Sequence, residues 1–266
     1  MARSRTRNAF LWRPSDSSRQ CGELETFGAD GDPSDSQIGL DVAPATNGCG
    51  AYWGGVAGRS VWRLVGDRPE TSLFDSGGAA VDGFLARVGA TTACPGGEAP
   101  WSVRFLPSEP GARAAVERVT GRRCAPGVVA AVTVPEASPL AAARCDGADG
   151  ACDAPLAVPL ATGVSRQLAL LGLQGDGAPG WAVAVGPVAD ATGVPLPSRA
   201  YDLASDGRDW LYLTFVTDGT LGVVGTDAFS CPPLTNGAGP GRWLLALQPE
   251  GFGSEGFCAW AQRFGP

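Results

Sequence analysis

Residues 243–264 read WLLALQPEGFGSEGFCAWAQRF, and this stretch decides the fold that the sequence predicts. An apolar segment is followed by a turn rich in glycine and proline, and a tryptophan then opens a second apolar segment. The same plan occurs at residues 84–105, FLARVGATTACPGGEAPWSVRF, and at residues 167–185, QLALLGLQGDGAPGWAVAV. Alternating apolar segments around a Gly/Pro turn predict an antiparallel hairpin at each of the three places.

The tryptophans of these hairpins recur with a nearly constant period. Trp101, Trp181 and Trp260 are 80 and 79 residues apart. A constant period with a shared local pattern is typical of repeat architectures. A fourth, degenerate echo of the pattern occurs at residues 10–13, FLWR.

Each unit also opens with a further strand or strand pair. Residues 200–225, AYDLASDGRDWLYLTFVTDGTLGVVG, predict two strands around an Asp206-Gly207 turn. Residues 39–55 predict a weaker version around Asn47-Gly48, and residues 127–134, GVVAAVTV, predict a strand without a hairpin signal before it. Four antiparallel strands per unit is the plan of a propeller blade. We therefore predict an all-β fold of about three four-stranded β-propeller-like blades, open or part of a larger ring, with a β-sandwich as the alternative.

Composition agrees with many short strands. The chain has 266 residues, with 39 Gly, 22 Pro and 44% hydrophobic residues. Turn-forming residues disfavour long helices, whereas the apolar content is too high for a disordered chain. We predict a flexible Arg-rich arm at 1–20 and blade-like repeats at 21–112, 113–190 and 191–266.

A family resemblance follows from the last third of the chain. The segments DWLYLTFVTDGTLGVVG (209–225), WLLALQPEG (243–251) and CAWAQRFG (258–265) resemble the bacterial seven-bladed-propeller-type (SBBP) repeat. The resemblance implies a secreted or surface protein and supplies no common catalytic residues. Two departures are the period of about 80 residues, longer than the family repeat, and the cysteine-bearing insertions. Three units are also fewer than the four to eight blades of a closed ring.

Charge and missing residue types restrict the chemistry. The net charge is −7, which argues against nucleic acid as the main partner because phosphate binding needs clustered cations. Histidine and lysine are both absent, so Ser-His-Asp triads, His-ligated zinc, Schiff-base lysines and Walker lysines are excluded. No apolar run reaches the ~18 residues of a membrane span. We predict that the chain is not an enzyme.

The even number of cysteines, with no CxxC pair, indicates disulfides and an oxidising compartment. We therefore expect an extracellular or cell-surface location, although residues 1–18 contain no apolar signal-peptide core. Sequential pairing predicts four local bridges: Cys21–Cys49, Cys94–Cys124, Cys145–Cys152 and Cys231–Cys258.

Two acidic loops are weak candidates for binding Ca²⁺, which takes six to eight oxygen ligands. The carboxylates are Asp30, Asp32, Asp35 and Asp41 in the first loop, and Asp146, Asp149 and Asp153 in the second. The alternative is ordinary turn chemistry on a solvated surface, with no cofactor. Residues 251–256, GFGSEG, match GxGxxG but precede a predicted strand, so we interpret them as a hairpin loop.

The sequence thus predicts a non-enzymatic secreted or cell-surface module that binds a protein or polysaccharide partner, or that self-assembles into a homo-oligomer. The alternative is a carbohydrate-active enzyme or lectin on a propeller-like fold. That alternative predicts an exposed tryptophan groove and two carboxylates about 5–10 Å apart. Its candidate carboxylates are Asp202, Asp206, Asp209 and Asp218.

Overall fold

The protein is all-β in the part of the chain that the computed structural model describes. The described residues are 9–13, 23–28, 37–45, 50–58, 60–65, 68–75, 82–88, 101–107, 113–122, 126–134, 140–145, 152–158, 167–187, 198–206, 208, 210–217, 221–225, 230–234, 241–248 and 260–264. The prediction of an all-β fold is confirmed. Within the same ranges, no helical segment has the length and apolar character needed to cross a bilayer.

The strands form four antiparallel sheets, which we name A to D. Sheet A contains β1 (Ala9–Arg13), β2 (Glu23–Gly28), β5 (Ser60–Val65) and β6 (Arg68–Asp75). Sheet B contains β3 (Gln37–Pro44), β4 (Ala51–Ala57), β7 (Asp82–Val88), β8 (Trp101–Pro107), β11 (Leu140–Cys145) and β12 (Leu156–Val158). Sheet C contains β9 (Ala115–Gly121), β10 (Gly127–Val134), β13 (Gln167–Gln174), β14 (Pro179–Pro187), β17 (Leu221–Gly225) and β18 (Ser230–Leu234). Sheet D contains β15 (Arg199–Ser205), β16 (Leu211–Thr217), β19 (Gly241–Leu247) and β20 (Trp260–Phe264).

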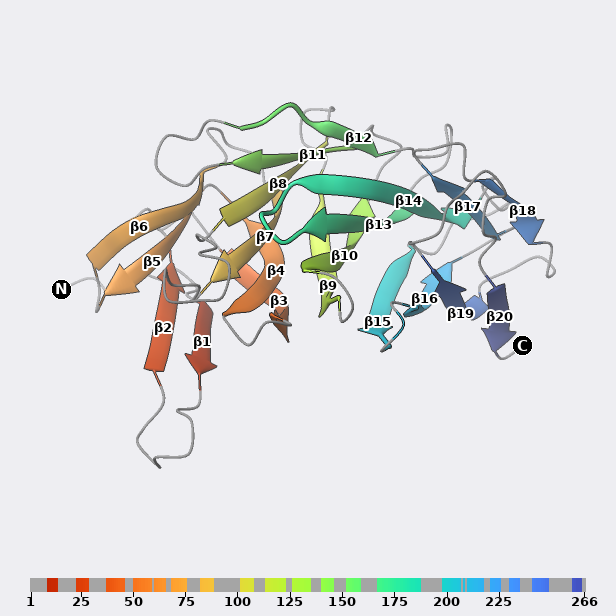
Figure 1. The fold of residues 1–266 in the computed structure, drawn as a ribbon, viewed down its shortest axis with the longest axis horizontal. Coiled ribbons are helices and arrows are strands. Elements are labelled where there is room, and N and C mark those ends of the chain that lie inside the picture. The colour runs from red at the N-terminus through yellow and green to blue at the C-terminus, as the bar shows by residue number, and fades with distance from the viewer. Residues whose placement is uncertain are drawn as a thin grey trace.

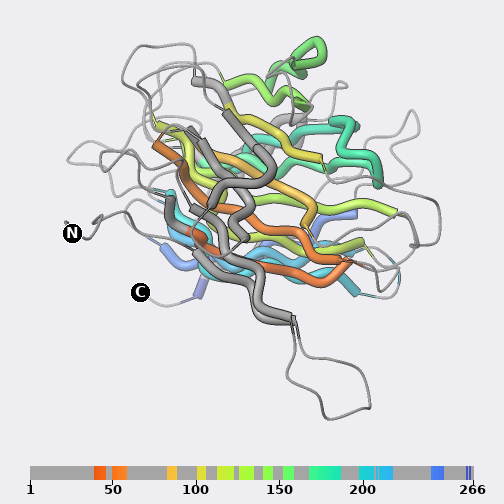
Figure 2. The backbone as a smooth tube through the Cα atoms, turned by 90° about the vertical axis from the view of Figure 1, so that its left-hand side faces the viewer, coloured from red at the N-terminus to blue at the C-terminus, as the bar shows by residue number. Residues whose placement is uncertain are grey.

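The sheets follow one another from A to D along the molecule (Figure 1). Viewed along this direction, strands of sheets B, C and D lie one behind another (Figure 2). None of the described sheets closes into a barrel. The architecture is therefore an open stack of antiparallel layers, and the predicted count of three blades is not confirmed.

Successive hairpins alternate between neighbouring sheets. In chain order the ten hairpins, from β1–β2 to β19–β20, join sheets A, B, A, B, C, B, C, D, C and D. Sheets B and C are each built from three hairpins, which we call first, second and third in chain order. Sheet D has the first and second hairpins. Sheet A has two hairpins, β1–β2 and β5–β6, which correspond to the second and third hairpins of sheet B. One repeat is thus six strands, and the chain adds the third hairpin to a sheet only after it has formed the first hairpin of the next sheet.

The three periodic tryptophans occupy equivalent places in this plan. Each lies on the second strand of a second hairpin, on β8, β14 and β20. Their pairing partners on the first strand of that hairpin are Arg87 for Trp101, Gly172 for Trp181 and Ala246 for Trp260. The period found in the sequence is therefore a structural period of one layer.

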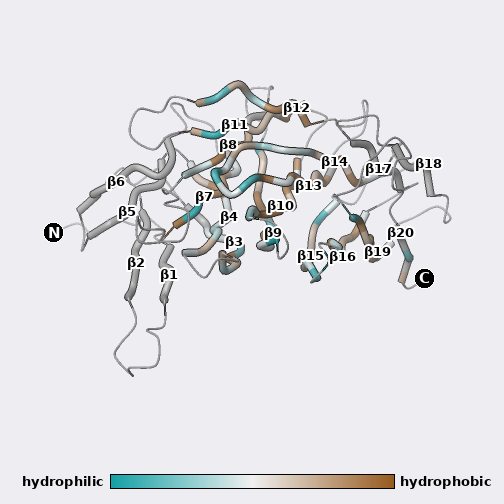
Figure 3. Tube along the Cα trace, viewed as in Figure 1, coloured by the Kyte–Doolittle hydropathy of each residue, from teal (hydrophilic) through white to brown (hydrophobic). Residues whose placement is uncertain are grey.

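Two of the three buried clusters found among the described residues combine side chains of neighbouring layers. One combines side chains of sheets B and C, such as Phe105 and Leu171, and the other combines side chains of sheets C and D, such as Leu170 and Phe215. Strand β10 contributes to both, with Val128 in the first and Val129 in the second. Its continuous apolar sequence is explained because both of its faces are buried. Hydrophobic residues accordingly follow β10 and β13 in the middle of the stack (Figure 3).

The predicted repeat boundaries fall between strands, at 112/113 between β8 and β9 and at 190/191 between β14 and β15. The predicted arm at 1–20 contains β1, which pairs with β2. The echo at residues 10–13 lies on this strand, at the place that β7 occupies in sheet B.

Candidate functional site at the bulged edge of the stack

The first strands of three sheets share a β-bulge at one position. The register shifts between Gly39 and Asp41 in β3, between Val116 and Arg118 in β9, and between Ala200 and Asp202 in β15. The residues at the bulges are Leu40, Glu117 and Tyr201. These strands are edge strands of sheets B, C and D, and bulges are a common way to protect edges from unwanted pairing. Strand β9 contacts both β3 and β15, so the three edges run along one side of the molecule.

Side chains of one layer form hydrogen bonds with the backbone of the edge strand in the next layer. Asp41 of β3 accepts a hydrogen bond from the Val119 amide of β9 at 2.8 Å. Glu117 of β9 accepts one from the Ala200 amide of β15 at 2.7 Å, and Arg118 donates from Nε to the Tyr201 carbonyl at 2.6 Å. These bonds satisfy backbone groups of edge strands β9 and β15.

One apolar position beside the bulge differs strongly in solvent exposure between layers. By their pairing, Val42 of β3, Val119 of β9 and Leu203 of β15 are equivalent residues that face the preceding layer. Val119 is 4% exposed and Leu203 is 5% exposed, whereas Val42 is 48% exposed. The bulge residue Leu40 is 40% exposed. The position that Val119 and Leu203 fill with a buried side chain in sheets C and D is therefore about half exposed in sheet B, at Val42.

A buried arginine lies between sheets B and C. The fully buried Arg87 donates to the Gly175 carbonyl at 3.3 Å, and its guanidinium lies 6.0 Å from the ring centroid of Tyr52. Trp101 donates to the same carbonyl from Nε1 at 2.8 Å. Burial raises the pKa of Tyr52, and the nearby positive charge of Arg87 opposes this increase. The β13–β14 loop of one layer is thus bound to the tryptophan position of the preceding layer.

The tip of the β15–β16 hairpin is organised by one carboxylate. Asp206 Oδ1 accepts from the amides of Arg208 at 2.7 Å and Trp210 at 3.0 Å, and Oδ2 accepts from the Tyr212 hydroxyl at 3.2 Å. The Arg208 amide is the main cause of a lowered pKa at Asp206. A general acid of a glycosidase needs a raised pKa, so Asp206 is poorly suited to that role.

We expect an NMR titration to place the pKa of Asp206 below that of an ordinary aspartate. Tyr212→Phe should raise this pKa because the variant loses one hydrogen bond to the carboxylate. A folded-state pKa below the unfolded one means that the contribution to stability is complete above about pH 4 and is lost as the pH falls. An unchanged pKa in Tyr212→Phe would contradict this assignment.

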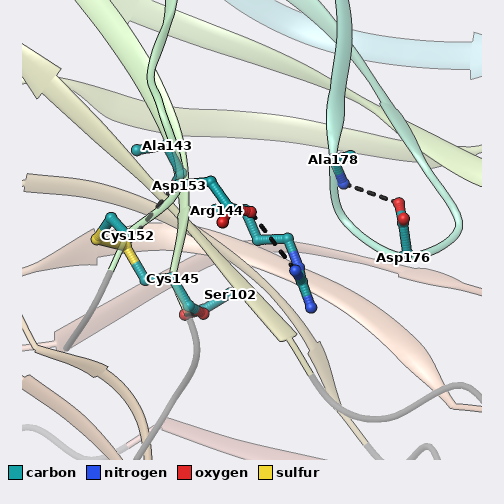
Figure 4. A network of polar contacts seen from close by, with 8 residues as sticks. All are labelled: Ser102, Ala143, Arg144, Cys145, Cys152, Asp153, Asp176 and Ala178. Carbon is teal, nitrogen blue, oxygen red and sulfur yellow. Dashed lines mark hydrogen bonds and ion pairs between the residues drawn. A yellow bond between two sulfur atoms is a disulfide. The ribbon is translucent and has the colours of Figure 1, made fainter. Parts of the chain in front are cut away.

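A disulfide confirms one predicted cysteine pair. Cys145 and Cys152 are bonded, with their Cα atoms 4.1 Å apart (Figure 4). Beside the bond, Arg144 forms an ion pair with Asp153 at 3.5 Å, and Ser102 donates from Oγ to the Cys145 carbonyl at 3.2 Å. The bridge thereby closes the loop after β11 against β8.

Replacing both cysteines, Cys145→Ala with Cys152→Ala, should lower the free energy of unfolding by about 2 kcal/mol, because an open loop has more freedom in the unfolded chain. Urea unfolding followed by circular dichroism measures this loss. The single substitution Cys152→Ala should cost a similar amount, since either change removes the bond. Wild-type stability in the double variant would show that the bridge contributes nothing.

Most other predicted site residues lie outside the described residues. Of the calcium candidates, only Asp41 and Asp153 are described, and both bind groups of the protein itself. The described ranges contain no group of three side chains that could hold a metal ion. Of the remaining cysteines, only Cys231 is placed, within β18. Outside the described residues lie Asp30, Asp32, Asp35, Asp146, Asp149, Asp209, Asp218, Cys21, Cys49, Cys94, Cys124, Cys258 and residues 251–256.

The outer face of sheet D differs from the corresponding faces of the inner sheets. Thr214 and Gln262 are exposed there, whereas the equivalent residues of sheet C, Ala131 and Val183, are buried. Polar residues at core positions are typical of the terminal layer of a repeat protein. Three aromatic side chains are also exposed in the described part of sheet D: Tyr201 at 51%, Tyr212 at 37% and Phe264 at 47%.

Comparison with known proteins gives no family for this chain. No model of a known protein family matches this chain, and no curated protein sequence matches it. The bulged edge was not identified in the sequence analysis. Its only local signals are Asp41 and Glu117, and acidic residues in strands are too common to indicate such bonds.

Proposed function

We propose that this chain is a non-enzymatic binding and structural module of the cell surface or the extracellular space. The observation that carries the proposal is the stack itself. Buried clusters join sheets B, C and D, and hairpins alternate between neighbouring sheets, so the layers form one continuous body. Such a body presents long edges and faces to macromolecules, as repeat proteins do.

The polar groups with the best-defined geometry support this proposal. Asp41, Glu117 and Arg118 bond the backbone of a neighbouring layer, and Asp206 orders a hairpin tip. Each group is used to hold the protein's own backbone or side chains in place. The Cys145–Cys152 disulfide fits an oxidising compartment and thus an extracellular location.

The resemblance to the SBBP repeat supports a related proposal about the architecture. Sheets B, C and D each contain a run of four neighbouring strands from their first and second hairpins, which is the strand plan of a propeller-like blade. We propose that these three runs are blade-like units and that the third hairpins are insertions that extend the preceding sheet.

A carbohydrate-binding function is the alternative. The observation that favours it is the exposure of Tyr212 and Phe264 on the outer face of sheet D, because aromatic rings on a flat polar surface can stack on sugars. The two residues lie on β16 and β20, with β19 between them.

Localisation and activity can be tested together. We expect antibodies against the protein to label intact cells of the source organism, and we expect no release of reducing ends from soluble or insoluble polysaccharides. Labelling only after permeabilisation would contradict the proposed location. Release of reducing ends that Asp202→Asn abolishes would establish the enzymatic alternative, whereas polysaccharide binding lost in Tyr212→Ala would establish the lectin.

A further inference from the structure

The Cys145–Cys152 disulfide joins a buried residue to an exposed one (Figure 4). Cys145 ends β11, is 3% exposed and pairs with Ser102 of β8 inside sheet B. Cys152 is exposed to solvent, and so are residues 153–155 that follow it. The two cysteines face each other as an antiparallel bridge. A soluble reductant can therefore reach the bond from the Cys152 side, and exposed disulfides are the ones that are readily reduced.

The backbone after Cys152 is held on sheet B by a short ladder. Strand β12 contains residues 156–158, and its pairing with β11 consists of three residue pairs. Before this ladder, the Asp153 amide donates to the Arg144 carbonyl at 2.8 Å, and the two side chains form an ion pair. The Asp153 side chain is 62% exposed, so this ion pair contributes little to stability. The disulfide is therefore the strongest local constraint on residues 152–158.

Strand β12 covers apolar groups where sheets B and C meet. It is the edge strand of sheet B, and it contacts β14 of sheet C. Val158 is 5% exposed, and Leu156 packs against the cluster that the two sheets share. Release of β12 exposes these side chains and makes β11 the edge strand, with unpaired backbone groups. The state of the disulfide thus decides which edge sheet B presents to solvent.

We propose that the Cys145–Cys152 disulfide is a redox switch, which a dithiol reductant opens to release residues 152–158 from β11. One thiolate of the reductant attacks Cys152 Sγ, the S–S bond breaks, and Cys145 leaves as a thiolate. The second thiol of the reductant then displaces Cys152 and closes the reductant's own disulfide. Two electrons pass from the dithiol to the two cysteines, and its two protons end on their sulfur atoms. The switch goes beyond the proposed function and does not depend on what the module binds.

Hydrogen exchange of the full chain, with dithiothreitol as the dithiol, tests the switch. We expect reduction to speed the exchange of amides in residues 152–158 about tenfold or more, because few contacts remain to protect them. Strand β10 should keep its protection, since both of its faces are buried. Alkylation by iodoacetamide, located by peptide mass spectrometry, reports whether Cys145 and Cys152 are reduced.

The double variant Cys145→Ala with Cys152→Ala is the control for the other cysteines of the chain. Residues 152–158 of this variant should exchange as fast as in the reduced wild type, and dithiothreitol should change them no further. Asp153→Asn removes the ion pair and keeps the disulfide, so this variant should stay protected until it is reduced.

Three outcomes would overturn the switch. The first is a disulfide that resists excess dithiothreitol in the folded chain, or one that is reduced while residues 152–158 stay protected. The second is exchange in β10 that rises together with exchange in residues 152–158, because the bond would then support the whole fold. The third is a response of the double variant to dithiothreitol, which would assign the opening to other cysteines.

Discussion

Trp101→Ala should lower the free energy of unfolding by about 4 kcal/mol, as expected for truncating a buried large aromatic side chain. Trp101 is 3% exposed and lies in the cluster between sheets B and C. Its ring packs closely against Gly177, which has a φ of 87°, and its Nε1 donates to the Gly175 carbonyl at 2.8 Å. The substitution removes the contact between the tryptophan position of one layer and the hairpin loop of the next.

Urea unfolding followed by circular dichroism measures this effect. Trp101→Phe separates its two causes, because phenylalanine keeps most of the apolar contact and loses the hydrogen bond, and it should cost about 1–2 kcal/mol. Tyr201→Ala is the control at an exposed aromatic residue and should change stability by less than about 0.5 kcal/mol. A loss below about 1 kcal/mol in Trp101→Ala would show that the tryptophan position is not important for joining the layers.

Gly54→Val should cost about 3 kcal/mol, because it inserts a branched side chain into a filled interface. Gly54 lies on β4 of sheet B and faces Val116 and Val119 of β9 in sheet C. A Cβ atom at Gly54 would overlap Val116 Cγ1 and would lie 2.9 Å from Val119 Cγ1. Both valines belong to the buried cluster, so neither can move without displacing its neighbours.

Compensation identifies the cause of this loss. Val116→Ala creates space at the same point, so the double variant Gly54→Val with Val116→Ala should be more stable than the sum of the two single losses predicts. Gly180→Val is the matched control, since a Cβ atom at Gly180 would make only an ordinary contact of 3.5 Å with the Gly172 carbonyl oxygen. Equal losses in Gly54→Val and Gly180→Val would contradict the close approach of sheets B and C.

Much of the local structure was predictable because it depends on neighbouring residues. In β16, Leu211, Leu213 and Phe215 are buried and alternate with Tyr212 and Thr214, as the sequence pattern predicts. The Cys145–Cys152 bridge closes a loop of seven residues and was identified from spacing alone. The period of the tryptophans also became a structural period, because each layer uses the same hairpin at the same place.

The third hairpins were missed for a physical reason. Strands β5–β6, β11–β12 and β17–β18 form hairpins that were not among those predicted from the sequence. Turn chemistry and side-chain alternation indicate that two strands pair, but they do not indicate which sheet the pair joins. Each of these hairpins returns to a sheet after the chain has formed the first hairpin of the next sheet. Its partner strand is therefore determined by contacts between distant parts of the chain.

The amino-acid sequence alone therefore accounts for the all-β character, the tryptophan-bearing hairpins and the period of about 80 residues, since these follow from the order of neighbouring side chains. Tertiary structure decided the stacking of four sheets, the alternation of hairpins between them and the exposure of Val42. The reason is that Val42, Val119 and Leu203 are all apolar residues in similar strands. Only the layer packed against each strand determines whether its side chain is buried.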